Sequence, residues 1–391
     1  MKIDSNTYIL KEKGSVAKIA LIIGIVGLVF SAIGYFSDSQ QFYFSYLTAF
    51  AFWVSLGLGG LFFTMLHHIS GAKWSTVLIR ISQAAMSVLP IMFLLFIPLF
   101  FGIKELYGWS NPQIVAESTV LQGKTGYLNS PFFIIRTIIY FGIWAILTFL
   151  INKYSRMQDE GEMTTKQLRI ISAPGMFLFA LTISFAAFDW LMSLDPHWYS
   201  TIFGAYYFGG SFVIIIAFLI IVANHLKSNG TLSTEIQNAH FSDLGKLFFG
   251  FIVFWAYLGG AQYFFIWYAN IPEETVWFLE RWKNSWKTVS LLLIFGHFLI
   301  PFISLVFYTT KRKRKIIVFF AFWLFIFHYV DMYWLIQPAF HHESAYFSWM
   351  DLTTFIGIGG IFLALFWKSF SAKAIIPVND PYLDASPHLH K

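Results

Sequence analysis

The residues of this chain that could do chemistry are few, and the most telling ones lie inside long apolar runs. Asp189 and Asp331 each come about 15 residues into such a run, which places them deep in a membrane if the runs are spanning helices. A carboxylate at that depth is costly when it is unpaired and faces lipid, so such residues usually face the bundle interior and serve a function. His328 precedes Asp331 by three residues and shares its helix face. A carboxylate and an imidazole together can accept and pass protons near neutral pH.

A second set of polar residues lies in similar apolar surroundings. Arg136, near one end of an apolar run, is the expected counter-ion of one aspartate. The other candidates for a proton-transfer path are side chains that can hydrogen-bond inside a membrane: Gln262, Tyr263 and His297. The alternative is structural, because a buried ion pair or hydrogen-bonded strut would also place aspartates there, and a lone histidine can be a packing residue.

Composition indicates which elements must position these residues. The chain is 57% hydrophobic and only 12% charged, whereas soluble domains carry about 25% charged residues. Apolar windows of about 18 residues or more recur along its length, each long enough to cross a bilayer. We therefore predict an all-α polytopic membrane protein, a single integral membrane domain over residues 1–391 with a retained first helix. The expected spans are 16–36, 42–67, 83–103, 131–151, 172–193, 200–224, 246–270, 287–309, 316–337 and 349–369.

Positive charge is distributed unevenly between the two sides of this predicted bundle. Of the 26 Lys and Arg residues, 20 fall on the side that holds both termini, including the run Lys311 to Lys315, and five fall on the other side. The positive-inside rule places the termini in the cytoplasm. The basic run suits anionic lipid, and nothing indicates nucleic acid. On the outer side, Glu105 to Ser130 should form a surface loop or cap, and Asp195 should cap the sixth helix.

Cysteine is absent from the sequence. Iron–sulfur ligation by thiolates, c-type haem attachment, disulfides and cysteine nucleophiles are therefore excluded. If the protein takes part in redox chemistry, a partner is expected to carry the metal.

Three stretches give the chain a resemblance to a known family: FDWLMSLDPHWYSTIFG, QYFFIWYANIPEE and HHISGAKWS. Together they resemble the NrfD-like family of membrane subunits, also called polysulfide reductase membrane subunits, as found in the quinol-oxidising alternative complex III of bacteria. The resemblance implies two four-helix bundles, about 42–193 and 200–337, flanked by the first and last helices. It also implies a bacterial inner-membrane location, a quinol pocket near the outer face, and no metal bound by the chain. The implied partners are an NrfD-like sister subunit and subunits that carry iron–sulfur clusters and c-type haem.

On this basis we expect a metal-free membrane subunit of a quinol:cytochrome c, or other acceptor, oxidoreductase that is not catalytic alone. Asp189 and Asp331 would accept protons, His328 would relay them and Arg136 would be a charge partner. A quinone pocket near the outer face is a further expectation, and its candidate residues are Asp189, Trp190, Tyr263 and Trp267.

Three other interpretations remain open at this point. A b-type cytochrome would use His297 and His328 as axial haem ligands. A secondary transporter would need interrupted helices in matching halves, for which the prolines inside two spans give some support. A purely structural anchor of a redox complex would need no acid–base residues at all.

Overall fold

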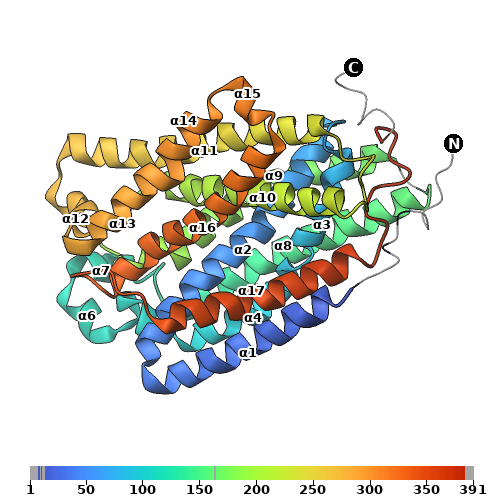
Figure 1. The fold of residues 1–391 in the computed structure, drawn as a ribbon. Helices are drawn as coiled ribbons and strands as arrows, with labels where there is room; N and C mark the ends of the chain where they lie inside the picture. The colour runs from blue at the N-terminus through green and yellow to red at the C-terminus, as the bar shows by residue number, and fades with distance from the viewer. Residues whose placement is uncertain (1–7, 9, 11–13, 163, 384–391) are drawn as a thin grey trace.

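The computed structural model describes residues 8, 10, 14–162 and 164–383, and all regular structure in this part of the chain is helical (Figure 1). Ten of its helical segments are long and apolar enough to cross a membrane, which confirms the predicted all-α polytopic membrane fold. These are α1 (Val16–Ser37), α2 (Ser39–Ser70), Thr76–Phe101 containing α3 (Ile79–Met86) and α4 (Leu89–Phe101), α8 (Ser130–Asp159), α9 (Thr165–Trp190) with its extension η4 (Met192–Leu194), α10 (Phe203–Ser228), α11 (Asn238–Ala269), Asn284–Leu305 containing α13 (Asn284–Leu292), η5 (Leu293–Leu299) and α14 (Ile300–Leu305), α16 (Arg314–Ile336) with η6 (Gln337–Ala339), and α17 (Trp349–Phe370).

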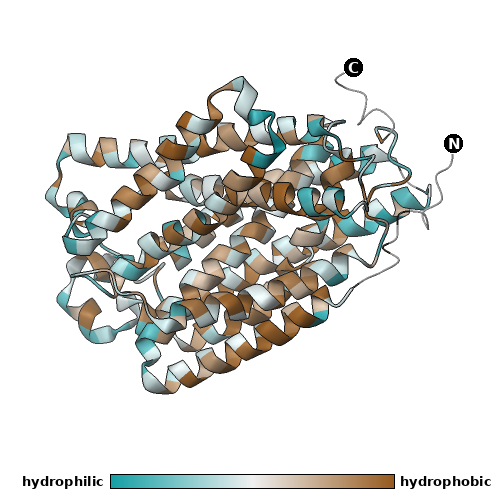
Figure 2. Cartoon of the chain, viewed as in Figure 1, coloured by the Kyte–Doolittle hydropathy of each residue, from teal (hydrophilic) through white to brown (hydrophobic). Residues whose placement is uncertain are grey.

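Burial separates the central helices from the peripheral ones. In α2 and α10, 89% and 83% of the most apolar window is buried inside the protein, whereas in α1 only 17% is buried. In Figure 2 most of the α1 ribbon has the colour of hydrophobic residues, as expected of a helix that faces lipid. The two buried helices are therefore the axis of the fold, and the other spans pack around them.

We name two sets of neighbouring spans around this axis. The first bundle consists of α2, α3, α4, α8 and α9, and the second bundle consists of α10, α11, α13, η5, α14 and α16. They meet where α2 packs against α10 and α16. Outside the two bundles, α1 packs on α17. The two helices are so close that a Cβ on Gly27 would lie 2.6 Å from the backbone nitrogen of Gly357. Glycine at this crossing allows the two backbones to touch.

Short helices cover the end of the first bundle at which α9 finishes, which we call the distal end. They are α5 (Ile103–Leu106), η3 (Gly108–Ser110), α6 (Pro112–Glu117) and α7 (Thr119–Lys124), and they lie at the same end as α12 (Pro272–Glu280) (Figure 1). The Tyr107 hydroxyl donates to the Trp190 carbonyl at 3.0 Å, and Lys124 Nζ donates to the Pro196 carbonyl at 2.6 Å. The predicted cap is confirmed, and it closes the first bundle at this end.

One local prediction at the distal end was wrong. Asp195 does not cap the sixth span, because α10 begins only at Phe203 and its N-cap position is occupied by Ile202 without a side-chain bond. Asp189 is the penultimate residue of α9, which starts at Thr165 and so begins earlier than the predicted span. Hydropathy marks the apolar run, whereas the helix itself continues through polar residues on either side.

Candidate functional site

Asp189 is held by a complete set of partners within the first bundle. Arg136 donates to both carboxylate oxygens, from Nε to Oδ2 at 2.8 Å and from Nη2 to Oδ1 at 2.9 Å. The Tyr140 hydroxyl donates to Oδ2 at 2.6 Å. Arg136 also donates to the Tyr127 carbonyl at 2.9 Å, and its guanidinium lies over the Tyr127 ring. This arrangement is a bidentate, charge-compensated pair that fixes α8 to α9.

Asp331 lies in the second bundle and has a different kind of environment. Its side chain is fully buried, and its oxygens accept from two neutral donors, the Tyr206 hydroxyl at 2.5 Å and Trp255 Nε1 at 3.0 Å. Among the described residues, no Lys, Arg or His nitrogen lies within 4.0 Å of this carboxylate. The group is therefore hydrogen-bonded without a compensating charge, which is the setting in which a carboxyl group can hold a proton.

Two fully buried histidines lie beside Asp331. His328 Nε2 bonds Ser55 Oγ at 2.9 Å, and this hydroxyl donates to the Phe52 carbonyl at 2.6 Å. The serine hydroxyl has one proton, so it accepts from His328, which leaves Nδ1 of His328 as an unprotonated lone pair. That Nδ1 has no hydrogen-bond partner, and neither nitrogen of His297 has one. One ligand atom from each of His297, His328 and Asp331 lies within 4.8 Å of the other two.

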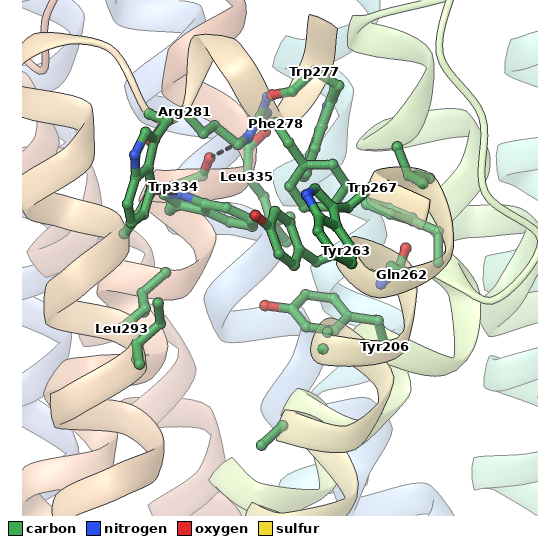
Figure 3. Close-up of a pocket in the computed structure, with 18 of the residues that line it drawn as sticks. Tyr206, Gln262, Tyr263, Trp267, Trp277, Phe278, Arg281, Leu293, Trp334 and Leu335 are labelled. Atoms are coloured by element: carbon green, nitrogen blue, oxygen red, sulfur yellow. Dashed lines mark hydrogen bonds between the residues drawn. The ribbon is translucent and has the colours of Figure 1, made fainter. Parts of the chain in front are cut away.

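A cavity of about 750 Å³ opens beside this cluster at the distal end of the second bundle (Figure 3). It lies between α11, α12, α13 and α16, and its lining is mostly aromatic and aliphatic. In Figure 3, Arg281 lies at one end and Tyr206 at the other, with Gln262 and Trp267 along one side and Trp334 on the other. A large apolar cavity with a few polar groups is the usual form of a small-molecule site.

The polar groups of the cavity lie at its two ends and along one side. The guanidinium of Arg281 donates to three backbone carbonyls, those of Trp334, Trp277 and Leu335, and it stacks on the Trp277 ring. No carboxylate lies within 4.0 Å of it in the described part of the chain, and burial lowers the pKa of Arg281 to about 9. The Tyr206 side chain lies at the other end, and along one side Oε1 of Gln262 is buried without a hydrogen-bond partner. The cavity therefore offers a ligand a cationic donor at one end and a free acceptor along one side.

The cavity and Asp331 share a wall. Tyr206 and Trp255 both line the cavity, and both donate hydrogen bonds to Asp331 on their far side. A molecule in the cavity can thus touch the phenol that is bonded to the carboxyl group, while Asp331 itself stays dry. His297 and His328 do not line the cavity.

Most of the candidate residues from the sequence lie in three separate places in the structure: the cavity, the Arg136–Asp189 pair and the cluster around Asp331. Gln262, Tyr263 and Trp267 line the cavity, and the last two lie on its exposed rim. Asp189 and Trp190 do not line it, and Trp190 donates to Thr137 within the aromatic core of the first bundle. Arg136 lies with Asp189, whereas His297 and His328 lie with Asp331.

Several residues of the cavity escaped the sequence analysis. Tyr206, Trp255, Trp277 and Arg281 are the main examples. Trp255 and Trp277 look like ordinary membrane aromatics in sequence. Arg281 could have been identified as a candidate from the sequence, because it is one of only five basic residues on the less basic side of the bundle.

The geometry also bears on the haem interpretation. The His297 ring packs against the Trp255 ring with centroids 3.8 Å apart, and the His328 ring packs against Gly210, where an added Cβ would lie 3.0 Å from Cε1. A porphyrin between two axial imidazoles would need these neighbours to move apart. Packing of this kind favours a small ligand over haem at the two histidines.

The fold and the site define an all-α polytopic membrane protein with one aromatic cavity that adjoins a buried acid–histidine cluster. No protein-family model matches the chain, and no curated protein matches it significantly.

Proposed function

We propose that the chain is the membrane subunit of a quinol-oxidising complex and that the cavity of the second bundle binds the quinol. The observation that carries the proposal is the shared wall, since Tyr206 lines the cavity and donates to Asp331, a buried carboxyl group without a cation. The ligand class follows from the lining, because a quinol has an aromatic ring, a long apolar tail and two hydroxyls on opposite sides of the ring. The aromatic lining suits the ring and tail, and the exposed rim suits entry from lipid.

The chemistry assigned to this chain is one proton transfer. A quinol hydroxyl gives its proton to the Tyr206 oxygen while Tyr206 passes its own proton to Asp331, so the phenol ends as it began and Asp331 becomes neutral. Gln262 accepts a hydrogen bond from the second hydroxyl and orients the ring. The electrons leave to a metal centre of a partner subunit, because the chain has no cysteine to hold an iron–sulfur cluster or a c-type haem.

The resemblance to NrfD-like subunits extends the proposal to the assembly. In this view the chain is an ActF-type subunit of an alternative complex III in a bacterial inner membrane, with both termini in the cytoplasm. Its partners are an NrfD-like sister subunit and subunits with iron–sulfur clusters and c-type haem. The Arg136–Asp189 pair is then a structural strut, and proton transfer belongs to the second bundle.

Two neighbouring tyrosines provide a matched test in the assembled complex. Tyr206→Phe removes the relay hydroxyl and keeps the ring, whereas Tyr207→Phe removes a buried hydroxyl that donates to the Ala51 carbonyl, away from the cavity. Quinol oxidation should fall about 100-fold or more in the first variant, as expected for loss of an acid–base group, and stay within about twofold in the second, which removes an ordinary hydrogen bond.

Photolabelling with an azido-quinone locates the binding site independently of turnover. Labelled peptides should come from α11 and α12, which carry most of the cavity lining. Labelling confined to partner subunits, or equal turnover in the two tyrosine variants, would refute the proposal.

A further inference from the structure

We propose that His297, His328 and Asp331 form a site for a divalent first-row transition-metal ion of the zinc class. The three side chains come from two elements, η5 and α16, and all are fully buried. The site stands on its own geometry and does not depend on quinol binding in the adjacent cavity.

The first argument is the balance of donors and acceptors. Nδ1 of the neutral His328 ring carries a lone pair that has no hydrogen-bond partner. Asp331 accepts two hydrogen bonds, and neither comes from a histidine. Both nitrogens of His297 lack partners, although one of them must be an acceptor in the neutral ring. Buried polar groups without partners are costly, so the unsatisfied lone pairs create a place for an electrophile.

The second argument is distance. Three atoms no more than 4.8 Å apart can all lie within about 2.8 Å of one point, and inward movements of less than about 1 Å would give zinc–ligand bonds of about 2.0–2.2 Å. Two imidazoles and one carboxylate are a donor set that zinc uses with water in a fourth position, and iron and other divalent ions accept the same set.

The third argument is the support around the ligands. His328 donates from its other nitrogen to Ser55, and Asp331 is fixed by Tyr206 and Trp255. Bonds of this kind orient the ligands of metal sites and set the histidine tautomer.

The backbone that carries His297 is also unusual. Leu293–Leu299 is a π-helical segment inside an otherwise α-helical span, and such segments are frequent at functional sites. Gly296 allows it to approach α16, because a Cβ there would lie 2.0 Å from the Phe327 ring. A regular helix with a side chain at 296 would not bring His297 to this position.

A bound cation and a proton on Asp331 would exclude one another, so the metal would inhibit proton transfer at the neighbouring cavity. This consequence rests on the proposed function, whereas the site itself does not.

The test measures metal directly on the complex purified without chelator and without a histidine tag. Metal analysis after equilibration with Zn²⁺, followed by dialysis, should give about one ion per chain beyond the partner subunits' metals. Replacement by Co²⁺ should give the visible bands of a low-symmetry, four- or five-coordinate site. His297→Gln should lose this ion, whereas His67→Gln, which replaces a buried histidine bonded to Ser75 at the other end of α2, should keep it.

The outcomes separate the two proposals. Wild-type complex with neither the additional zinc nor the cobalt bands means that only water or a proton occupies the cluster, and this result overturns the inference. Equal metal content in wild type and His297→Gln overturns it as well, since the ion then lies elsewhere. If His297→Gln fails to assemble, X-ray absorption on the wild-type ion decides, because two imidazoles must appear among its ligands. Gln262→Leu changes the cavity but removes no bond to the three ligands, so it should lower quinol oxidation and retain the metal. Failure of quinol oxidation and failure of metal binding can therefore be told apart.

Discussion

Replacing Asp189 by Asn should damage stability, whereas the same replacement at Asp331 should spare it and remove function. Asp189→Asn leaves the Arg136 guanidinium buried with no carboxylate opposite, since the charge that compensated it is gone. Breaking a buried pair in this way costs about 3–5 kcal/mol. A loss of that size is a large part of the total stability of a typical domain, about 5–15 kcal/mol. We therefore expect poor assembly of Asp189→Asn.

A second substitution at the same pair should restore much of the loss. Replacing both Arg136 and Asp189 with apolar residues, as Met and Leu, removes the unpaired charge, and buried ion pairs can be replaced in this way at little cost. Recovery will be incomplete, because the Tyr140 hydroxyl loses its acceptor and the Tyr127 carbonyl loses a donor. Each of these groups is expected to cost about 1–3 kcal/mol unless water reaches it.

Asp331→Asn presents a smaller structural problem. The asparagine amide keeps one oxygen as an acceptor for Tyr206 or Trp255 and loses the other, so one buried donor is left without an acceptor at a cost of about 1–3 kcal/mol. No cation is left unpaired. Thermal stability can be measured on the complex in nanodiscs from its size-exclusion profile after heating to a series of temperatures. Wild type should be the most stable, Asp331→Asn less stable and Asp189→Asn the least stable. Quinol oxidation per assembled complex should collapse only in Asp331→Asn. The reverse ranking of stability, or wild-type turnover in Asp331→Asn, would show that the roles of the two aspartates are assigned wrongly.

The remaining predictions concern topology, chromophores and pH. Single cysteines introduced at Lys313 and Glu274 should react with an impermeant reagent from opposite sides of the membrane, and labelling from one side would contradict the ten-span topology. The isolated subunit should show no stoichiometric Soret band in its absorption spectrum. Burial lowers the pKa of His341, whose Nε2 bonds Gln41 Oε1 at 2.7 Å. Because the unfolded chain then binds the proton more readily, stability should fall as pH drops below about 6.5, and His341→Asn should reduce this dependence in thermal unfolding.

The helices were predictable because the apolar runs are long and a helix that spans a bilayer must be long and apolar. The limits of these helices were not, since α11 begins at Asn238 and α8 continues to Asp159, in polar sequence that hydropathy does not separate from loops. The pairing of Arg136 with Asp189 could be expected in outline, because a lone intramembrane arginine needs an anion. Two lining residues of the cavity, Tyr263 and Trp267, were among the expected pocket residues, but the full lining could not be predicted because its walls come from segments that no periodicity connects.

The two aspartates show where sequence reasoning reaches its limit. In sequence they look alike, since each lies near the end of an apolar run and within three residues of a tryptophan. In the structure one faces an arginine, whereas the other accepts from Tyr206 and Trp255, which are 125 and 76 residues away. A carboxylate paired with a guanidinium through two hydrogen bonds fixes the helices that carry the two groups. A carboxyl group between neutral donors can exist with or without a proton, and the cavity behind Tyr206 supplies a place from which that proton can come. The difference between the two aspartates therefore lies in their partners, and only the folded chain brings those partners together.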